Sequence, residues 1–138
     1  MRPTLLDTNV LSELVRLKPN AQVERFLEVC EEPFLSAAVF HEIAYGIERM
    51  RDVVGKQKVE VFFRGVKQRF EGRVVAIDAT IAEMSGRLRA AAANEGRALS
   101  QMDAMIAACA IGVSGRLATR NIRDFQWLGI DLVNPWND

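Results

Sequence analysis

Short apolar runs alternate along this chain with longer segments whose apolar residues recur at helical spacing. The apolar runs fall at residues 4–6, 33–36, 74–77, 117–119 and 130–133, and their length predicts buried β-strands. The segments between them predict helices over 10–15, 21–30, 37–50, 56–70, 79–95 and 101–112. Segment 51–55 is polar and contains a glycine, so we predict a turn there.

The order of these elements predicts an α/β fold, because helices long enough for a crossover separate the strands. We expect a single domain over residues 1–138. Its central, mostly parallel sheet would have four to five short strands, with helices on both faces. Ser36 and Asp78 are predicted helix N-caps, since each directly precedes a predicted helix.

Composition narrows the function classes only a little. The 138 residues carry 18 basic and 18 acidic side chains, so any affinity for nucleic acid must come from a local patch or a metal. No apolar run approaches the ~18 residues of a membrane span, and Asp7 and Glu13 interrupt any signal-peptide core, so we expect a cytoplasmic protein. Cys30 and Cys109 are far apart and lie in apolar helical surroundings, which predicts reduced thiols in the core.

Acidic residues mark the ends of several predicted elements. Asp7 ends the first strand, Glu42 lies on the helix after the second, and Asp103 lies in the first turn of a helix that starts after Ser100. Asn121 and Asp124 follow the fourth strand. Carboxyl ends of parallel strands share one edge of the sheet, where α/β proteins bind ligands, so Asp7, Asp103 and the Asn121 region are candidates for one site. Glu42 can join them only if its helix packs across that edge.

Each acid also has a structural interpretation. Asp7 and Asp103 fit helix capping, Glu42 could pair with Arg49 or Arg51, and Asp124 suits an ordinary turn. Together they favour a site, because several carboxylates at one edge repel one another and need a cation.

An all-carboxylate cluster favours Mg²⁺ or Mn²⁺ over zinc, and the chemistry these ions serve best is displacement at phosphorus. The residues that other catalytic mechanisms require are not evident in the sequence. His41 is the only histidine and is expected to be a partly exposed helix residue. There is no serine in a nucleophile elbow and no glycine-rich phosphate loop.

The same residues resemble a known family over essentially the whole chain. Four segments carry the resemblance: Leu5-Leu6-Asp7-Thr8-Asn9, Glu42 with Gly46-Ile47, Asp103 with Ile106-Ala107-Ala108, and Thr119-Arg120-Asn121 with Asp124-Phe125. They are similar to PIN-domain proteins, and the ending Asn134-Pro135-Trp136 resembles VapC-type and FitB-like toxins, also called plasmid-stability proteins.

The resemblance implies a Mg²⁺- or Mn²⁺-dependent endoribonuclease that is the toxin of a type II toxin–antitoxin pair. It implies Asp7 and Asp103 as principal metal ligands, with Glu42 completing the acidic pocket. Relatives often carry a fourth acid after strand four, where this chain has Asn121. Either Asn121 serves as a neutral ligand, or Asp124 supplies the charge.

Further expectations concern the surroundings of the pocket. Polar groups behind the ligands would orient the carboxylates and water: Thr8, Asn9 and Thr119. Basic residues around the edge would contact single-stranded or looped RNA: Arg16, Lys18, Arg49, Arg51, Arg120 and Arg123. The helices predicted over 37–50 and 56–70 would either pack on the sheet or form a groove for the C-terminal segment of an antitoxin, a small DNA-binding protein.

The family also implies a homodimer, and a heterotetramer or larger assembly with the antitoxin. Two alternatives stay open. One is a non-catalytic PIN-like module that binds RNA or protein. The other is a receiver-type phosphate-handling enzyme, which would need a phosphoacceptor aspartate in a central strand and a lysine after the last strand; neither is evident.

Overall fold

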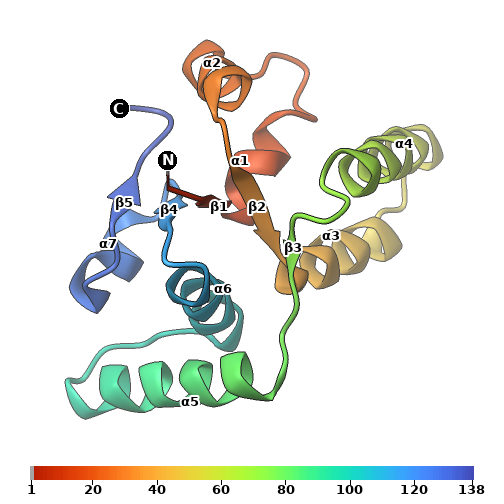
Figure 1. The fold of residues 1–138 in the computed structure, drawn as a ribbon. Helices are drawn as coiled ribbons and strands as arrows, with labels where there is room; N and C mark the ends of the chain where they lie inside the picture. Colours follow the sequence, from red (N-terminus) through yellow and green to blue (C-terminus); the bar gives the residue numbers. More distant parts are fainter. Residues whose placement is uncertain (1) are drawn as a thin grey trace.

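The computed structural model describes residues 2–138 and is built around a five-stranded sheet (Figure 1). The strands are β1 (Thr4–Leu6), β2 (Pro33–Ser36), β3 (Val74–Val75), β4 (Arg116–Ala118) and β5 (Leu132–Val133). Their order in the sheet is β3-β2-β1-β4-β5, and all four pairings are parallel. The predicted α/β fold with a parallel sheet is therefore confirmed.

Helices cover both faces of the sheet. They are α1 (Thr8–Glu13), α2 (Ala21–Val29), α3 (Ala37–Arg49), α4 (Val53–Arg69), α5 (Ala79–Asn94), α6 (Gln101–Gly112), α7 (Ile122–Phe125) and the 3-10 turn η1 (Gln126–Leu128). In Figure 1, α1 and α2 lie above the sheet, and α6 and α5 lie below it. Helix α6 packs on β1, β2 and β4, and α5 packs on the outer side of α6.

The core is centred on β1, β4 and α6. Leu5, Leu6 and Leu117 have no exposed surface, as expected for the central strands of a sheet covered on both faces. Helix α6 lies between the sheet and α5 and is apolar on nearly every side. Alanines at 104, 107, 108 and 110 let it approach both neighbours closely, and all four are fully buried.

The capping predictions are confirmed, whereas the turn predicted at 51–55 is partly wrong. Ser36 Oγ accepts from the backbone N–H of Ala38, and Asp78 Oδ1 accepts from that of Ile81. Helix α4 already begins at Val53, because Asp52 accepts from the N–H of Gly55 and caps it. Val53 and Val54 are strongly exposed and do not belong to the buried face of α4, which is why the hydrophobic pattern predicted a later start for this helix.

Several short elements also differ from the prediction. Strand β3 has two residues instead of four, since it is an edge strand that pairs only with β2. Helix α7 and η1 were not predicted, because elements of four and three residues are too short to show a period.

Both cysteines are free thiols, as predicted. Cys109 is buried and donates to Ser36 Oγ at 3.3 Å, and burial raises the pKa of its thiol. Cys30 lies at the end of α2 and is half-buried, so the prediction that it belongs to the core is wrong.

Within residues 2–138, no helix has the length and apolarity needed to cross a bilayer.

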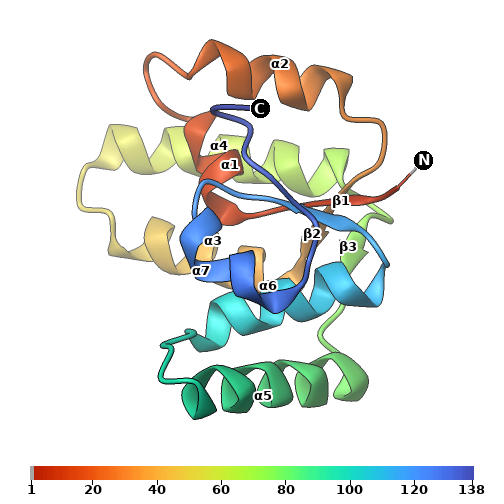
Figure 2. The same ribbon diagram turned by 90° about the vertical axis from the view of Figure 1, so that its left-hand side faces the viewer.

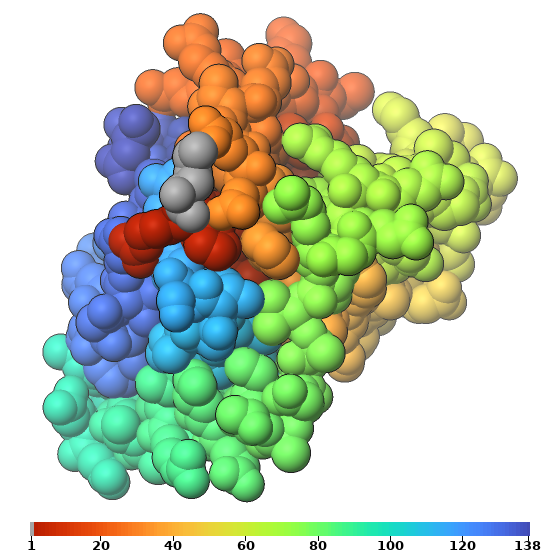
Figure 3. Space-filling model, in the orientation of Figure 1, coloured from red at the N-terminus to blue at the C-terminus, as the bar shows by residue number. Residues whose placement is uncertain are grey.

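The parallel strands all have their C-terminal ends on one side of the sheet, on the left in Figure 2. We call this side the carboxyl edge. Helices α1 and α3 begin directly after β1 and β2, and the α3–α4 hairpin extends beyond this edge (Figure 2). Figure 3 shows the opposite side of the molecule, where the chain enters β1. The two edges of the sheet therefore present different elements to solvent, and the candidate acids belong to the carboxyl edge.

Candidate active site

Asp7 stands at the end of β1 and is only 4% exposed. Its Oδ1 accepts from the backbone N–H of Thr8 at 2.8 Å, which makes it the N-cap of α1. Its Oδ2 accepts from Thr119 Oγ1 at 2.7 Å and from Asn9 Nδ2 at 3.3 Å. The capping interpretation is therefore correct, but a cap alone does not need a buried carboxylate with partners from two strand ends.

Burial raises the pKa of Asp7 to about 6. Hydrogen bonds from Thr119 and Thr8 lower this pKa, whereas the charges of Asp103 and Glu42 raise it further. The three carboxylates are therefore close enough to repel one another, although they come from three different elements.

Glu42 lies on α3, half-buried, and is connected to the start of α1. Thr8 Oγ1 donates to Glu42 Oε1 at 2.6 Å, so the residue next to Asp7 holds Glu42 at the site. The suggested ion pair of Glu42 with Arg49 or Arg51 is absent from the described part of the chain. Glu42 thus lies at the carboxyl edge because its helix packs there.

Asp103 lies in the first turn of α6, whose N-cap is Ser100. The backbone N–H of Asp103 donates to Ser100 Oγ at 3.0 Å, which confirms the predicted cap. Partial burial raises the pKa of Asp103, a hydrogen bond with Ser100 lowers it, and the charges of Asp124 and Glu42 raise it. Asp103 is therefore the link between Glu42 and the segment after β4.

Two residues compete for the fourth position of the site. The backbone N–H of Asn121 donates to Thr119 Oγ1 at 2.9 Å, but the Asn121 side chain is exposed and caps nothing. Asp124 lies one turn further along, in α7, and its charge acts on Asp103. Asp124 therefore supplies a negative charge near Asp103, whereas Asn121 is joined to the site through its backbone N–H.

The donor set at this edge fits a hard divalent cation. It consists of carboxylate oxygens alone, and their mutual repulsion would be relieved by a positive charge. Across residues 2–138, no three acidic, histidine or cysteine side chains are grouped closely enough to form a ready-made metal cage. Mg²⁺ retains several of its waters and binds through one or two carboxylates, so this ion does not require a complete protein cage.

The predicted basic residues differ in their relation to the acids. Arg120 is the nearest by contact, because its backbone N–H donates to Asn9 Oδ1 at 3.4 Å and Asn9 in turn contacts Asp7. Its guanidinium lies 4.9 Å from the ring centroid of Trp136. Arg123 is exposed on α7, directly before Asp124. These two arginines therefore border the candidate site.

In the described part of the chain, the other predicted basic residues form no ion pair with the candidate acids. Arg16 pairs with the buried Glu13, whose Oε2 also accepts from the backbone N–H of Asn20, so Arg16 helps to hold the α1–α2 loop. Lys18 is exposed in that loop, and Arg51 is exposed between α3 and α4. Arg49 contacts Tyr45, a residue that the sequence pattern did not single out. His41 is exposed, as expected.

Two cavities meet the carboxyl edge and the face beside it. One of ≈220 Å³ lies between α1, α3 and α4 and is lined by Thr8 and Glu42 together with Gly46, Met50 and Phe62. A second of ≈250 Å³ lies between α1, α2 and α4 and shares Phe62 with the first. We call this pair of cavities the α1–α4 groove.

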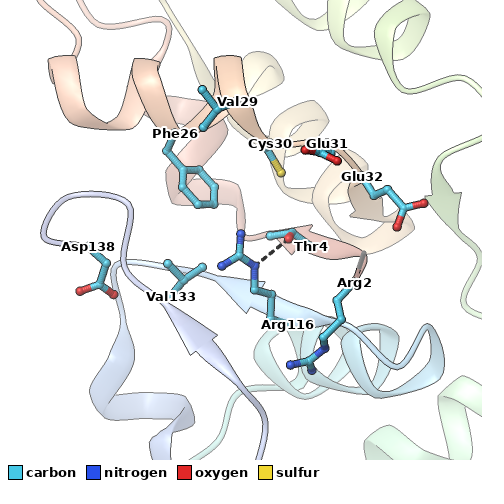
Figure 4. Close-up of a pocket in the computed structure, with 10 residues that line it drawn as sticks. All are labelled: Arg2, Thr4, Phe26, Val29, Cys30, Glu31, Glu32, Arg116, Val133 and Asp138. Atoms are coloured by element: carbon cyan, nitrogen blue, oxygen red, sulfur yellow. Dashed lines mark hydrogen bonds between the residues drawn. The ribbon is translucent and has the colours of Figure 1, made fainter.

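A cavity of ≈360 Å³ lies at the other edge of the sheet (Figure 4). Thr4 and Arg116, the first residues of β1 and β4, lie on its wall with Phe26. Arg116 Nε donates to Thr4 Oγ1 at 2.9 Å, and its guanidinium lies 5.6 Å from the Phe26 ring centroid. None of the candidate acids lines this cavity, so it is separate from the site.

Comparisons with known proteins show the family and the fold of the chain. The family model of the PIN domain matches residues 4–127. Toxin FitB of Neisseria gonorrhoeae is 32% identical over 97% of this chain and 99% of its own length. The VapC ribonuclease Y4jK of Sinorhizobium fredii is 30% identical over 96% of both chains. The structure of DNA-bound VapBC from Salmonella typhimurium superposes with a TM-score of 0.82 at 27% identity, covering 98% of this chain and 99% of that one.

Proposed function

This chain belongs to the PIN-domain family, and we propose that it is the toxin of a toxin–antitoxin pair that cleaves RNA with Mg²⁺ or Mn²⁺. One observation carries the proposal: Asp7, Glu42 and Asp103 converge at the carboxyl edge of the sheet and act electrostatically on one another. Similarity to a protein named toxin and to one named ribonuclease supports it.

In the proposed mechanism, Asp7 and Asp103 hold the cation and Glu42 completes the acidic pocket. The bound ion supplies activation of water and neutralisation of phosphate charge. The chain's own residues fix the carboxylates. Thr119 and the N–H of Thr8 orient Asp7, and the Thr8 hydroxyl orients Glu42.

RNA is the proposed substrate, held by local positive charge. The chain has no net charge, so Arg120 and Arg123 beside the acids, with Arg49 on α3, would supply the attraction to phosphate. Single-stranded or looped RNA suits such an edge, because bases in a duplex cannot be reached.

The proposed antitoxin occupies the α1–α4 groove. Two apolar side chains that line it are exposed: Val15 and Val61. An amphipathic helix would cover them in the helix-in-groove mode and extend towards Glu42, which lines the groove. The VapBC neighbour is bound to DNA, which supports a DNA-binding partner. We propose a homodimer of the toxin in the cytoplasm, assembled with antitoxin into a heterotetramer or larger complex.

The test is cleavage of mixed structured and single-stranded RNA by the purified, antitoxin-free chain. Cleavage is expected with Mg²⁺ or Mn²⁺ and should disappear when EDTA is present. A folded chain that cleaves none of several RNAs under these conditions would contradict the proposal. The non-catalytic alternative would gain support if the same chain bound RNA without cutting it.

The fourth acidic position gives a separate prediction. Asp124→Ala is expected to lower the cleavage rate by about 10-fold or more, and Asn121→Ala by less, because only the charge of Asp124 acts on Asp103. Both side chains are exposed, so neither change should lower the melting temperature much. Initial rates at saturating Mg²⁺ provide the comparison, and the reverse ranking would assign the position to Asn121.

A further inference from the structure

Tyr45 is the only tyrosine of the chain and is 59% exposed on α3. Among the large apolar side chains exposed within residues 2–138, it is the only aromatic one. Aromatic rings bury much surface when they find a partner, so an exposed ring beside a candidate active site indicates a binding contact.

The position of Tyr45 on its helix relates it to Glu42. Ala38, Glu42, Tyr45 and Arg49 follow one another at spacings of four, three and four residues, which places them on one side of α3. Ala38 is buried, Glu42 is half-buried and hydrogen-bonded to Thr8, and Arg49 is exposed. With a rise of about 1.5 Å per residue, Tyr45 lies about 4.5 Å beyond Glu42 along the axis. In Figure 2, α3 runs outward from the carboxyl edge, so successive residues of this helix lie progressively further from the sheet.

Arg49 contacts the Tyr45 ring and places a positive charge beside it. Its Nη1 donates to Tyr45 Oη at 2.9 Å, and its Cζ lies 5.7 Å from the ring centroid. In the part of the chain that the structure describes, no acid forms an ion pair with Arg49. Its charge is therefore free for an anionic ligand, next to an aromatic face.

The Tyr45 ring and the adjacent Arg49 guanidinium together suit a ligand that carries both a flat base and a phosphate. Unpaired bases stack on aromatic rings, and guanidinium groups bind phosphate oxygens. Single-stranded RNA presents both groups at every nucleotide, whereas a protein helix would require an apolar surface around the ring. The residues of α3 that lie one turn from Tyr45 on its exposed side are polar: His41, Glu48 and Arg49.

We propose that Tyr45 stacks on an unpaired RNA base beside the bond to be cut, while Arg49 binds a phosphate of the same strand. The pair positions single-stranded RNA along α3 and directs it to Glu42 and Asp7. This inference rests on the proposed function, but RNA binding can be measured without cleavage.

The experiment uses a short fluorescent single-stranded RNA and the full chain carrying Asp7→Asn, so that the RNA stays intact. Tyr45→Ala added to this chain is expected to raise the Kd about 5- to 150-fold, the usual effect of losing one stacked base. Tyr45→Phe should bind almost normally. Val29→Ala is the matched control, since it removes a similarly exposed apolar side chain on α2, on the wall of the opposite cavity. In the active chain, Tyr45→Ala should raise KM and leave kcat nearly unchanged.

Stacking has a specific signature in the same assay. An RNA with an abasic nucleotide at the stacked position should bind equally well to the parent chain and to the chain that also carries Tyr45→Ala. Unchanged RNA affinity and KM for Tyr45→Ala would overturn the inference, as would weaker antitoxin binding with normal RNA binding. If the Asp7→Asn parent binds no RNA, the inference is also wrong. RNA binding without cleavage by the unmodified chain would contradict only the proposed activity.

Discussion

Asp7→Asn is expected to lower metal-dependent RNA cleavage by more than about 100-fold while leaving the fold intact. Loss of a residue that merely orients a metal ligand typically costs about 10- to 100-fold, so loss of the ligand charge itself should cost more. Asparagine keeps one oxygen that can accept from Thr8 or Thr119 and is as good an N-cap as aspartate. The change therefore separates the two roles of Asp7, because it removes the charge and retains the cap.

Asp78→Asn is the matched control for this prediction. Asp78 also follows a strand and caps a helix, accepting from the N–H of Ile81 at 2.9 Å, but it is exposed and lies outside the site. Rates of RNA cleavage and circular dichroism should be compared for both variants. Full activity of Asp7→Asn would show that Asp7 is only a cap, and its failure to fold would show that the charge is needed for structure.

Most of the fold could be predicted from the sequence, because most helices and strands are long enough to show their hydrophobic pattern. Five apolar runs became five strands, and Asp7 fell at the carboxyl edge because a parallel sheet leaves no other place for it. Strand order was not predictable, since it depends on which crossovers pack best. As a result, the hydrogen bond from Thr119 to Asp7 joins residues 112 positions apart and could only be seen in the structure.

The remaining parts of the site escaped prediction for physical reasons. The electrostatic link from Asp124 to Asp103 depends on α7, which has only four residues and shows no period. Tyr45 was missed because one exposed aromatic residue does not disturb the buried pattern of α3. The sequence signal for Tyr45 was its position three residues after Glu42. This spacing points to the site only when Glu42 is known to contact Thr8.

The raised pKa of Asp7 leads to a second large effect, on stability. In the metal-free fold this pKa is about 6, against a usual value of 3.8, so the folded chain holds a proton that the unfolded chain releases. The contribution of Asp7 to stability should therefore be highest when Asp7 is protonated and should fall as the pH rises from about 4 through about 6. The shift corresponds to a loss of about 3 kcal/mol above that range. Asp7→Asn carries no charge and should escape this loss.

Urea unfolding of both chains in EDTA, at several values of pH between about 4 and 7.5, measures the effect. The free energy of unfolding of wild type relative to Asp7→Asn should decrease by up to about 3 kcal/mol across this range. Adding Mg²⁺ near pH 7.5 should then stabilise the wild type by about 2.7 kcal/mol at 100 times its Kd, and the variant much less. Mg²⁺ binds the charged form of Asp7, which burial destabilises. The pH dependence and the stabilisation by Mg²⁺ therefore both arise from the buried charge of Asp7. A pH-independent difference would show that Asp7 titrates normally, and equal stabilisation of both chains by Mg²⁺ would place the metal elsewhere.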